Sequence, residues 1–149
     1  MERAKEFANG LIDFIYNSPS QFHATKELVN VLEKNNFRKL NMEDRWQLEK
    51  EGKYYCVKNS SALVAFVIGK GEVEDHGFKI IGAHTDSPTF RIKPNPEITV
   101  ENNYLKLNTE VYGGPILNTW FDRPLSVAGR VAVKTDNPLR PREELVDIK

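Results

Sequence analysis

The chain has 149 residues, of which 40% are hydrophobic and 28% charged, and 21 Lys and Arg residues balance 21 Asp and Glu residues. This length and composition are typical of one soluble globular domain with a sizeable core. The balanced charge argues against nucleic acid or an anionic membrane as a partner, and no apolar run is long enough to span a bilayer.

The N-terminal residues and the cysteine content indicate the cellular compartment. The N-terminus has mixed charge and lacks the apolar region of a signal peptide. The single cysteine, Cys56, cannot form an internal disulfide and lies in a strand-like pattern. We therefore expect a cytoplasmic protein in which Cys56 is a core residue and not a nucleophile.

Two amphipathic helices are predicted at the start of the chain. Residues Ala4 to Ile15 repeat apolar side chains with helical spacing, and an Asn-Ser-Pro turn at 17–19 ends this pattern. Ser20 can cap a second helix that runs to about Asn35. We interpret His23, in the first turn of this helix, as a surface or interface histidine, since the sequence gives it no local partner.

A sheet region is predicted next. Phe37 to Leu40 is expected to start it, and Tyr54 to Val57 and Leu63 to Ile68 are expected to be strands. Because Leu63 to Ile68 is almost entirely apolar, we expect it to be a central strand. The acidic loop from Gly69 to Gly77 contains His76, which we interpret as a solvated histidine because no regular element holds a metal geometry there.

The most distinctive stretch is Ile-Ile-Gly-Ala-His-Thr-Asp-Ser-Pro at 80–88. Phe78 to Ala83 predicts a buried strand, and Pro88 disfavours its continuation as a central strand. Side chains alternate along an extended chain, so His84 and Asp86 would point to the same side. They would lie at the carboxyl end of the strand, where open α/β sheets usually bind ligands.

The His-x-Asp pair has a metal-binding interpretation and a structural one. Neutral imidazole is a good zinc ligand, and Asp86 could accept a hydrogen bond from its other ring nitrogen or orient a water beside the metal. Alternatively, His84 is a packed or solvated histidine and Asp86 begins a turn before Ser87. A catalytic zinc site needs about three protein ligands, and the other histidines show no ligand-pair spacing.

A hairpin is predicted in the second half of the chain. Thr89 to Lys93 alternates apolar and polar residues, and prolines at 94 and 96 interrupt this pattern. Ile98 to Val100 and Tyr104 to Leu107 then flank a turn. The paired glycines at 113–114 predict a close backbone approach or a positive φ.

The last residues predict two strands joined by a linker. Leu125 to Val133 has a strand pattern, residues 135–144 are rich in proline and charge, and residues 145–149 begin another strand. We therefore expect a sequence that is interrupted rather than complete.

A series of short motifs runs in order from near residue 10 to near residue 134. They are Ser18-Pro-Ser-x-Phe-His23, Trp46-x-Leu, Gly52-Lys-Tyr-Tyr55, Ala65-Phe66, Gly82-Ala-His-Thr-Asp-Ser-Pro88, Lys93-Pro-x-Pro96, Glu110-Val-Tyr-Gly-Gly-Pro115, Thr119-Trp-Phe-Asp-Arg-Pro-Leu125 and Ala128-Gly-Arg-Val131. The set resembles the aspartyl aminopeptidase family of zinc metallopeptidases, which includes the vacuolar aminopeptidase.

The resemblance implies an α/β fold. The chain would be the N-terminal part of a two-zinc aminopeptidase domain, a mixed sheet flanked by helices, ending at the start of an inserted β-rich dimerisation domain. Residues 1–134 would belong to the catalytic domain, and residues 135–149 would be the linker and the start of the dimerisation domain. The chain would thus correspond to the N-terminal third of such an enzyme.

The resemblance also implies site residues. His84 matches the family's first zinc-ligand histidine, and Asp86 matches the catalytic aspartate that orients the site. The family's other ligands and its general-base glutamate lie beyond the inserted domain and have no counterpart here. We interpret Asp122 as structural, in a turn or an ion pair with Arg123.

The implied function is that of a zinc-dependent aminopeptidase, a hydrolase with two zinc ions per complete active site that releases N-terminal amino acids from peptides. This chain would carry part of the site and be inactive alone, exposing apolar surface meant for the rest of the domain. Its expected partners are peptide substrates and, in the full-length enzyme, further copies in a dimer-based homo-oligomer as large as a dodecamer. The alternatives are an inactive fragment or assembly module of the same fold, and an unrelated α/β domain in which His84 and Asp86 are structural.

Overall fold

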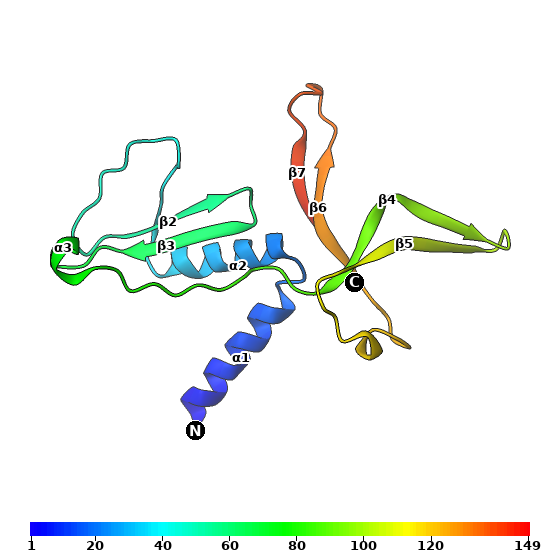
Figure 1. Cartoon of the computed structure of the whole chain (residues 1–149), viewed down its shortest axis with the longest axis horizontal. Coiled ribbons are helices and arrows are strands. Elements are labelled where there is room, and N and C mark those ends of the chain that lie inside the picture. The colour runs from blue at the N-terminus through cyan, green and yellow to red at the C-terminus, as the bar shows by residue number, and fades with distance from the viewer. The chain divides into compact units, whose positions relative to one another are not determined.

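The computed structural model describes all residues from 1 to 149 and divides them into two compact units (Figure 1). Unit 1 comprises Met1–Thr85 and Val127–Lys149, and unit 2 comprises Asp86–Ser126. The length alone favours one domain, so the division is a feature of the structure that composition did not predict. No helix is long and apolar enough to cross a membrane.

Both predicted helices are confirmed in unit 1. Helix α1 spans Glu2–Tyr16, and helix α2 spans Gln21–Lys34. The Ser20 side chain caps α2 by accepting a hydrogen bond from the His23 backbone N–H at 3.4 Å. The Ser20 hydroxyl also lies 2.8 Å from Nδ1 of His23, so this histidine has the local partner that the sequence did not reveal.

A three-stranded mixed sheet with the order β1-β2-β3 follows the helices. Strand β1 (Arg38–Lys39) pairs in parallel with β2 (Lys53–Lys58), which pairs antiparallel with β3 (Ala62–Val67). The mixed sheet and its helices confirm the predicted fold class. The prediction that the apolar strand is central is wrong, because β3 is an edge strand and Val64 is 61% exposed.

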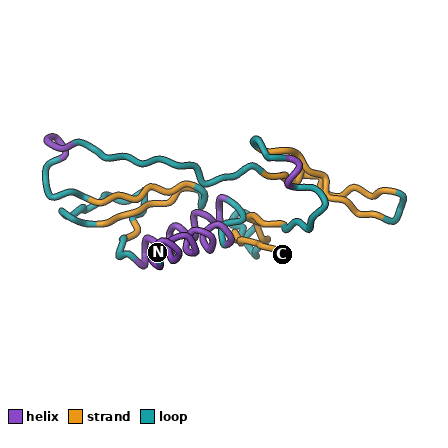
Figure 2. Tube along the Cα trace, turned by 90° about the horizontal axis from the view of Figure 1, so that it is seen from below, coloured by secondary structure: helices purple, strands orange, loops and turns teal.

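The predicted strand from Phe78 to Ala83 is absent, and residues 77–88 form a loop (Figure 2). A strand needs a neighbour that pairs with its backbone groups, and no strand of this chain pairs with this segment. Its apolar side chains are accordingly in solvent, with Ile80 86% and Ile81 100% exposed. A short helix α3 (Val73–His76) precedes the loop, and His76 is exposed at its end.

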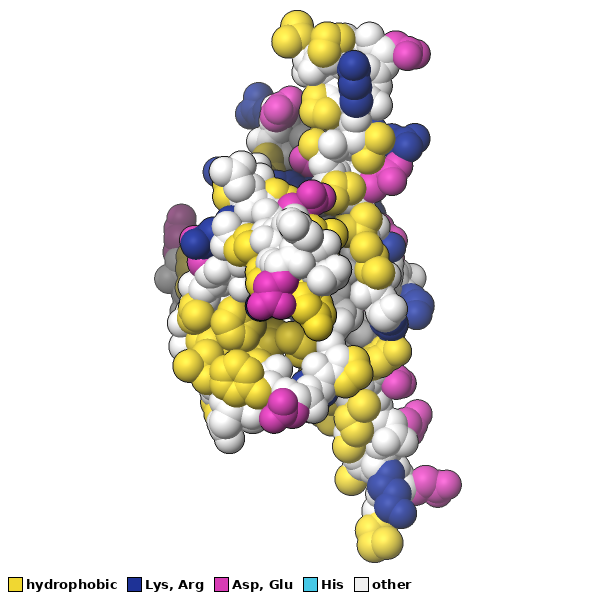
Figure 3. Space-filling model, turned by 90° about the vertical axis from the view of Figure 1, so that its right-hand side faces the viewer, with side chains coloured by type: hydrophobic (Ala, Val, Ile, Leu, Met, Phe, Trp, Pro, Cys, Tyr) yellow, Lys and Arg dark blue, Asp and Glu magenta, His cyan; other side chains and the backbone are white.

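The core of the chain is small. The buried residues are Ala24 and Thr25 on α2 and Tyr54, Tyr55 and Cys56 on β2. Cys56 is thus confirmed as a core residue, but the sizeable core expected from composition is absent. Large hydrophobic side chains elsewhere are exposed, and Figure 3 shows hydrophobic side chains at the molecular surface, as expected for apolar surface that this chain does not itself cover.

Unit 2 is built on the predicted hairpin. Strand β4 (Thr89–Val100) pairs antiparallel with β5 (Tyr104–Tyr112), and the register shifts between Ile92 and Glu97, where the two prolines lie. The prolines therefore distort β4 but do not end it. After the 3₁₀ helix η1 (Leu117–Thr119), Trp120 meets Phe90 edge-on at 5.1 Å between ring centroids. Asp122 has φ 55° in a turn, consistent with a structural role.

The last two predicted strands form an antiparallel pair in unit 1, but the second begins at Arg142, within residues 135–144 that the sequence predicted to be a linker. Strand β6 spans Val127–Val133 and pairs with β7 (Arg142–Ile148). Residues 134–141 connect the two strands. The predicted domain boundary after residue 134 concerns the longer protein and stays a prediction.

Candidate metal centre

The two predicted site residues lie in the loop of residues 77–88, where unit 1 passes into unit 2. His84 belongs to unit 1 and is exposed, whereas Asp86 belongs to unit 2 and is half-buried. Neither residue lies at the end of a strand, contrary to the sequence prediction. The chain around each residue is therefore described separately.

The backbone beside His84 is tethered to the sheet of unit 1. The Thr85 hydroxyl donates a hydrogen bond to the backbone carbonyl of Ser61 at 2.8 Å. Ser61 follows the turn between β2 and β3, in which Asn59 and Ser60 both have positive φ. This bond fixes the residue next to His84, and His84 itself is exposed.

Asp86 is held by the hairpin of unit 2. The Tyr112 hydroxyl donates a short hydrogen bond to Oδ2 of Asp86, and the guanidinium of Arg91 lies 4.5 Å from the centroid of the Tyr112 ring. The hydrogen bond to Asp86, followed by the negative charge of Asp86, raises the pKa of Tyr112 above its ordinary value. Both effects favour the phenol over the phenolate, so Tyr112 remains a donor to Asp86.

The glycine after Tyr112 allows the close approach predicted from the sequence. Gly113 has φ +72°, and a Cβ built there would lie 3.4 Å from Cα of Pro88. A larger residue would be strained by this backbone conformation, and its Cβ would lie in van der Waals contact with Pro88. The Tyr-Gly pair at the end of β5 therefore packs against the segment that contains the candidate aspartate.

The residues present do not form a complete zinc site. Imidazole beside a carboxylate is suitable donor chemistry for zinc. However, no group of three or more His, Cys, Asp or Glu side chains in the chain could hold a metal ion, and a catalytic zinc needs about three protein ligands. The other two histidines do not supply the missing ligands, since His23 contacts Ser20 on α2 and His76 ends α3.

Sequence reasoning proposed His84 and Asp86 as site residues, and this assignment stays a prediction. It did not predict Tyr112 as the hydrogen-bond partner of Asp86. The signal was present in the motif Glu110-Val-Tyr-Gly-Gly-Pro115, whose glycines predicted a close approach. Which segment lies beside these glycines depends on the register of β4 and β5, in which Thr89 is opposite Tyr112.

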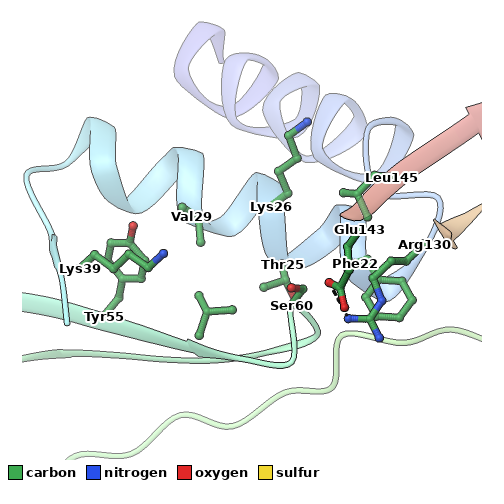
Figure 4. Close-up of a pocket in the computed structure, with 11 residues that line it drawn as sticks. Phe22, Thr25, Lys26, Val29, Lys39, Tyr55, Ser60, Arg130, Glu143 and Leu145 are labelled. Carbon is green, nitrogen blue, oxygen red and sulfur yellow. Dashed lines mark hydrogen bonds and ion pairs between the residues drawn. The ribbon is translucent and has the colours of Figure 1, made fainter. Parts of the chain in front are cut away.

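Unit 1 also contains a cavity of about 300 Å³ between α2, β2 and the β6–β7 pair (Figure 4). Its walls include Phe22 and Leu145, and Arg130 lies over the Phe22 ring at 4.4 Å. The guanidinium of Arg130 donates to Glu143 and to the Asn59 carbonyl, each at 3.1 Å. The cationic group is thus paired, and neither His84 nor Asp86 lines this cavity.

Comparison with known proteins gives a family match over most of the chain. The model of the aminopeptidase I zinc metalloprotease (M18) family matches residues 14–149. A probable M18 family aminopeptidase 2 of Clostridium novyi is 62% identical over 148 residues, which are 99% of this chain and 34% of that protein. The corresponding protein of Clostridium acetobutylicum is 59% identical over 100% of this chain and 34% of its own length. The chain thus spans about a third of the length of these relatives.

Solved structures share the fold. A structure of an Ape4 and Nbr1 complex matches with a TM-score of 0.90 and 38% identity, over 98% of this chain and 28% of that chain. The yeast mApe1 dodecamer matches with a TM-score of 0.85 and 31% identity, over 97% of this chain and 34% of that chain. An M18 aminopeptidase of Thermotoga maritima matches with a TM-score of 0.81 and 26% identity, over 99% of this chain and 30% of that chain. The mixed α/β arrangement is therefore that of known M18 structures.

Proposed function

Because the chain belongs to the aminopeptidase I zinc metalloprotease (M18) family, we propose that it is part of a zinc-dependent aminopeptidase that releases N-terminal amino acids from peptides. The observation that carries this proposal is the position of the His84-x-Asp86 pair within the matched residues 14–149. The exposure of His84 and the hydrogen bond that holds Asp86 support it. The remaining ligands and the general base would come from protein outside these 149 residues.

In this proposal each residue has one role. His84 would hold the metal through a ring nitrogen. In the complete enzyme, Asp86 would accept a hydrogen bond from the other ring nitrogen or would orient the attacking water. Zinc, at two ions per complete site, would supply a Lewis acid for the scissile carbonyl and a water of lowered pKa.

We also propose an assembly, a domain boundary and a location for the longer protein. The yeast mApe1 structure is a dodecamer, and by similarity the longer protein would form a dimer-based homo-oligomer as large as a dodecamer. The catalytic part would end near residue 134, and residues 135–149 would lead into a dimerisation domain. The free, buried thiol of Cys56 supports a cytoplasmic location.

The alternative is a catalytically inactive fragment or assembly module of the same fold. Its support is the absence of a complete metal-ligand group together with the exposed apolar side chains, of which Phe7 at 82% and Ile81 at 100% are examples. Exposed apolar surface of this extent is typical of a region that packs against other protein.

A hybrid enzyme distinguishes the peptidase function from the inactive module. In it, this chain replaces the matching third of the Clostridium novyi relative. Peptide hydrolysis, zinc content and melting temperature are then measured for the hybrid and for His84→Ala. Loss of a second-shell partner typically costs 10–100-fold, so we expect His84→Ala, which removes a direct ligand, to lower turnover by at least about 100-fold and to reduce bound zinc without loss of melting temperature.

The matched control is His76→Ala, since His76 is exposed at the end of α3. This variant should keep wild-type turnover and zinc. An inactive wild-type hybrid beside an active parent enzyme would favour the inactive module, and an active His84→Ala hybrid would exclude His84 as a ligand.

A further inference from the structure

The motif Glu110-Val-Tyr-Gly-Gly-Pro115 has no role in the function proposed so far. Its tyrosine contacts the candidate catalytic aspartate within unit 2. We propose that Tyr112 is a positioning residue of the peptidase site, whose hydroxyl fixes the orientation of the Asp86 carboxylate. This inference rests on the proposed function and extends it to a residue outside the His-x-Asp pair.

The hairpin register brings the two side chains together. Thr89 is opposite Tyr112 in the antiparallel ladder, and Asp86 precedes Thr89 by three residues. The phenol therefore extends from the end of β5 across to the segment that enters β4. Residues placed by a paired strand are held more precisely than residues on a free loop, so β5 gives the loop aspartate a rigid support.

Contacts on Tyr112 restrict its own movement. The Arg91 guanidinium lies 4.5 Å from the ring centroid, and the ring is half-buried. Gly113, with φ +72°, lets Pro88 approach the end of β5. The Phe90–Trp120 ring contact, at 5.1 Å between centroids, packs the first residues of β4 in the same unit. The donor and the chain that carries its acceptor are thus both fixed.

The chemistry of the bond suits a positioning role. A carboxylate has about four lone-pair sites, and the Tyr112 hydroxyl uses one site on Oδ2. Because a carboxylate can accept several hydrogen bonds at once, the bond from Tyr112 is compatible with the role proposed for Asp86 in the peptidase site. A phenol is also a neutral donor, so it orients Asp86 without adding a competing positive charge.

The test is Tyr112→Phe in the hybrid enzyme, because this change removes the hydroxyl and keeps the ring beside Arg91. Loss of a second-shell hydrogen bond typically costs 10–100-fold, so we expect kcat to fall by about 10–100-fold. KM and melting temperature should remain at the wild-type values. The matched control is Tyr104→Phe, which changes an exposed tyrosine of the same strand and should leave all three quantities unchanged.

Three outcomes would overturn the inference. If Tyr112→Phe has wild-type kcat while His84→Ala is inactive, the proposed function stands and Tyr112 has no positioning role. If kcat and melting temperature fall together, Tyr112 is merely structural. If the wild-type hybrid is inactive beside an active parent enzyme, the proposed function fails and this inference fails with it.

Discussion

Two regions of unit 1 have similar apolar patterns but very different surroundings. Strand β2 lies between two neighbouring strands and contains Tyr54 and Tyr55, which are 2% and 1% exposed. The Tyr55 hydroxyl donates a hydrogen bond to Glu33 of α2. The segment Phe78 to Ala83 is at least as apolar, yet Ile81 is 100% exposed. The difference arises because β2 finds both of its partner strands and a covering helix nearby in the sequence, whereas the later segment finds none in this chain.

This contrast shows what an apolar run can predict. The pattern indicates that a segment is suited to burial, but burial requires a surface that the pattern does not specify. The comparison therefore divides the chain into a self-sufficient part around α2 and β2, and parts that we expect to pack against the remainder of an M18 protein. In the isolated chain, substitutions in the part around α2 and β2 should lower the free energy of unfolding, whereas substitutions in the exposed apolar parts should not.

The largest expected effect is that of Tyr54→Ala. The Tyr54 hydroxyl accepts hydrogen bonds from the Glu49 backbone N–H at 2.9 Å and from Arg38 at 2.8 Å, and its ring packs on Phe66. Removing a buried aromatic side chain should lower the free energy of unfolding by about 3–5 kcal/mol, as measured by chemical denaturation of the 149-residue chain. Ile81→Ala should change it by less than about 0.5 kcal/mol, and equal losses would contradict the division.

The same Ile81→Ala change should behave differently in the hybrid enzyme. If residues 78–83 pair there with strands from outside this chain, the substitution removes a buried side chain and should cost about 2–5 kcal/mol. The comparison of Ile81→Ala in the hybrid with Ile81→Ala in the isolated chain measures this difference directly. A neutral effect in both proteins would mean that the segment remains exposed in the longer protein.

A smaller effect is expected from alkaline titration of the core. Burial, followed by the hydrogen bond to Glu33, raises the pKa of Tyr55 to about 12. Because the unfolded-state pKa is about 10, stability is fully present below pH 10 and falls as the pH rises from 10 to 12. Over this range the free energy of unfolding should fall by at most about 1.4 kcal/mol per pH unit.

Two variants show whether Tyr55 causes this fall in the free energy of unfolding. Tyr55→Phe should remove it, whereas Tyr104→Phe, at a 61% exposed position, should not. A slope that persists in Tyr55→Phe would mean that the core tyrosine does not titrate as its surroundings imply.

The accuracy of sequence prediction follows the range of the interactions. The limits of α2 were predictable because the cap at Ser20 and the end at Asn35 are local features. The strand at 78–83 was not, because its status depends on partners outside the segment. The exposure of β3 was also missed, since an apolar pattern does not reveal which strand ends the sheet.

The candidate site shows the same limit. His84 and Asp86 could be proposed because they lie two residues apart in one motif, and their assignment as metal ligand and orienting aspartate stays a prediction. The partner of Asp86 was missed because Tyr112 is 26 residues away. The register that joins them passes through the irregular pairing between Ile92 and Glu97. The prolines at 94 and 96 mark this place in the sequence but do not specify the size of the register shift.

The most direct test of the central claim is the zinc content per chain of the purified 149-residue polypeptide, with aminopeptidase activity measured on the same sample. The account predicts almost no bound zinc and no turnover, because His84 and Asp86 are only part of a ligand set and no group of three forms in the chain. About two tightly bound zinc ions with turnover would contradict it. That result would require the chain to complete the site itself, with ligands at residues that are assigned here to structure.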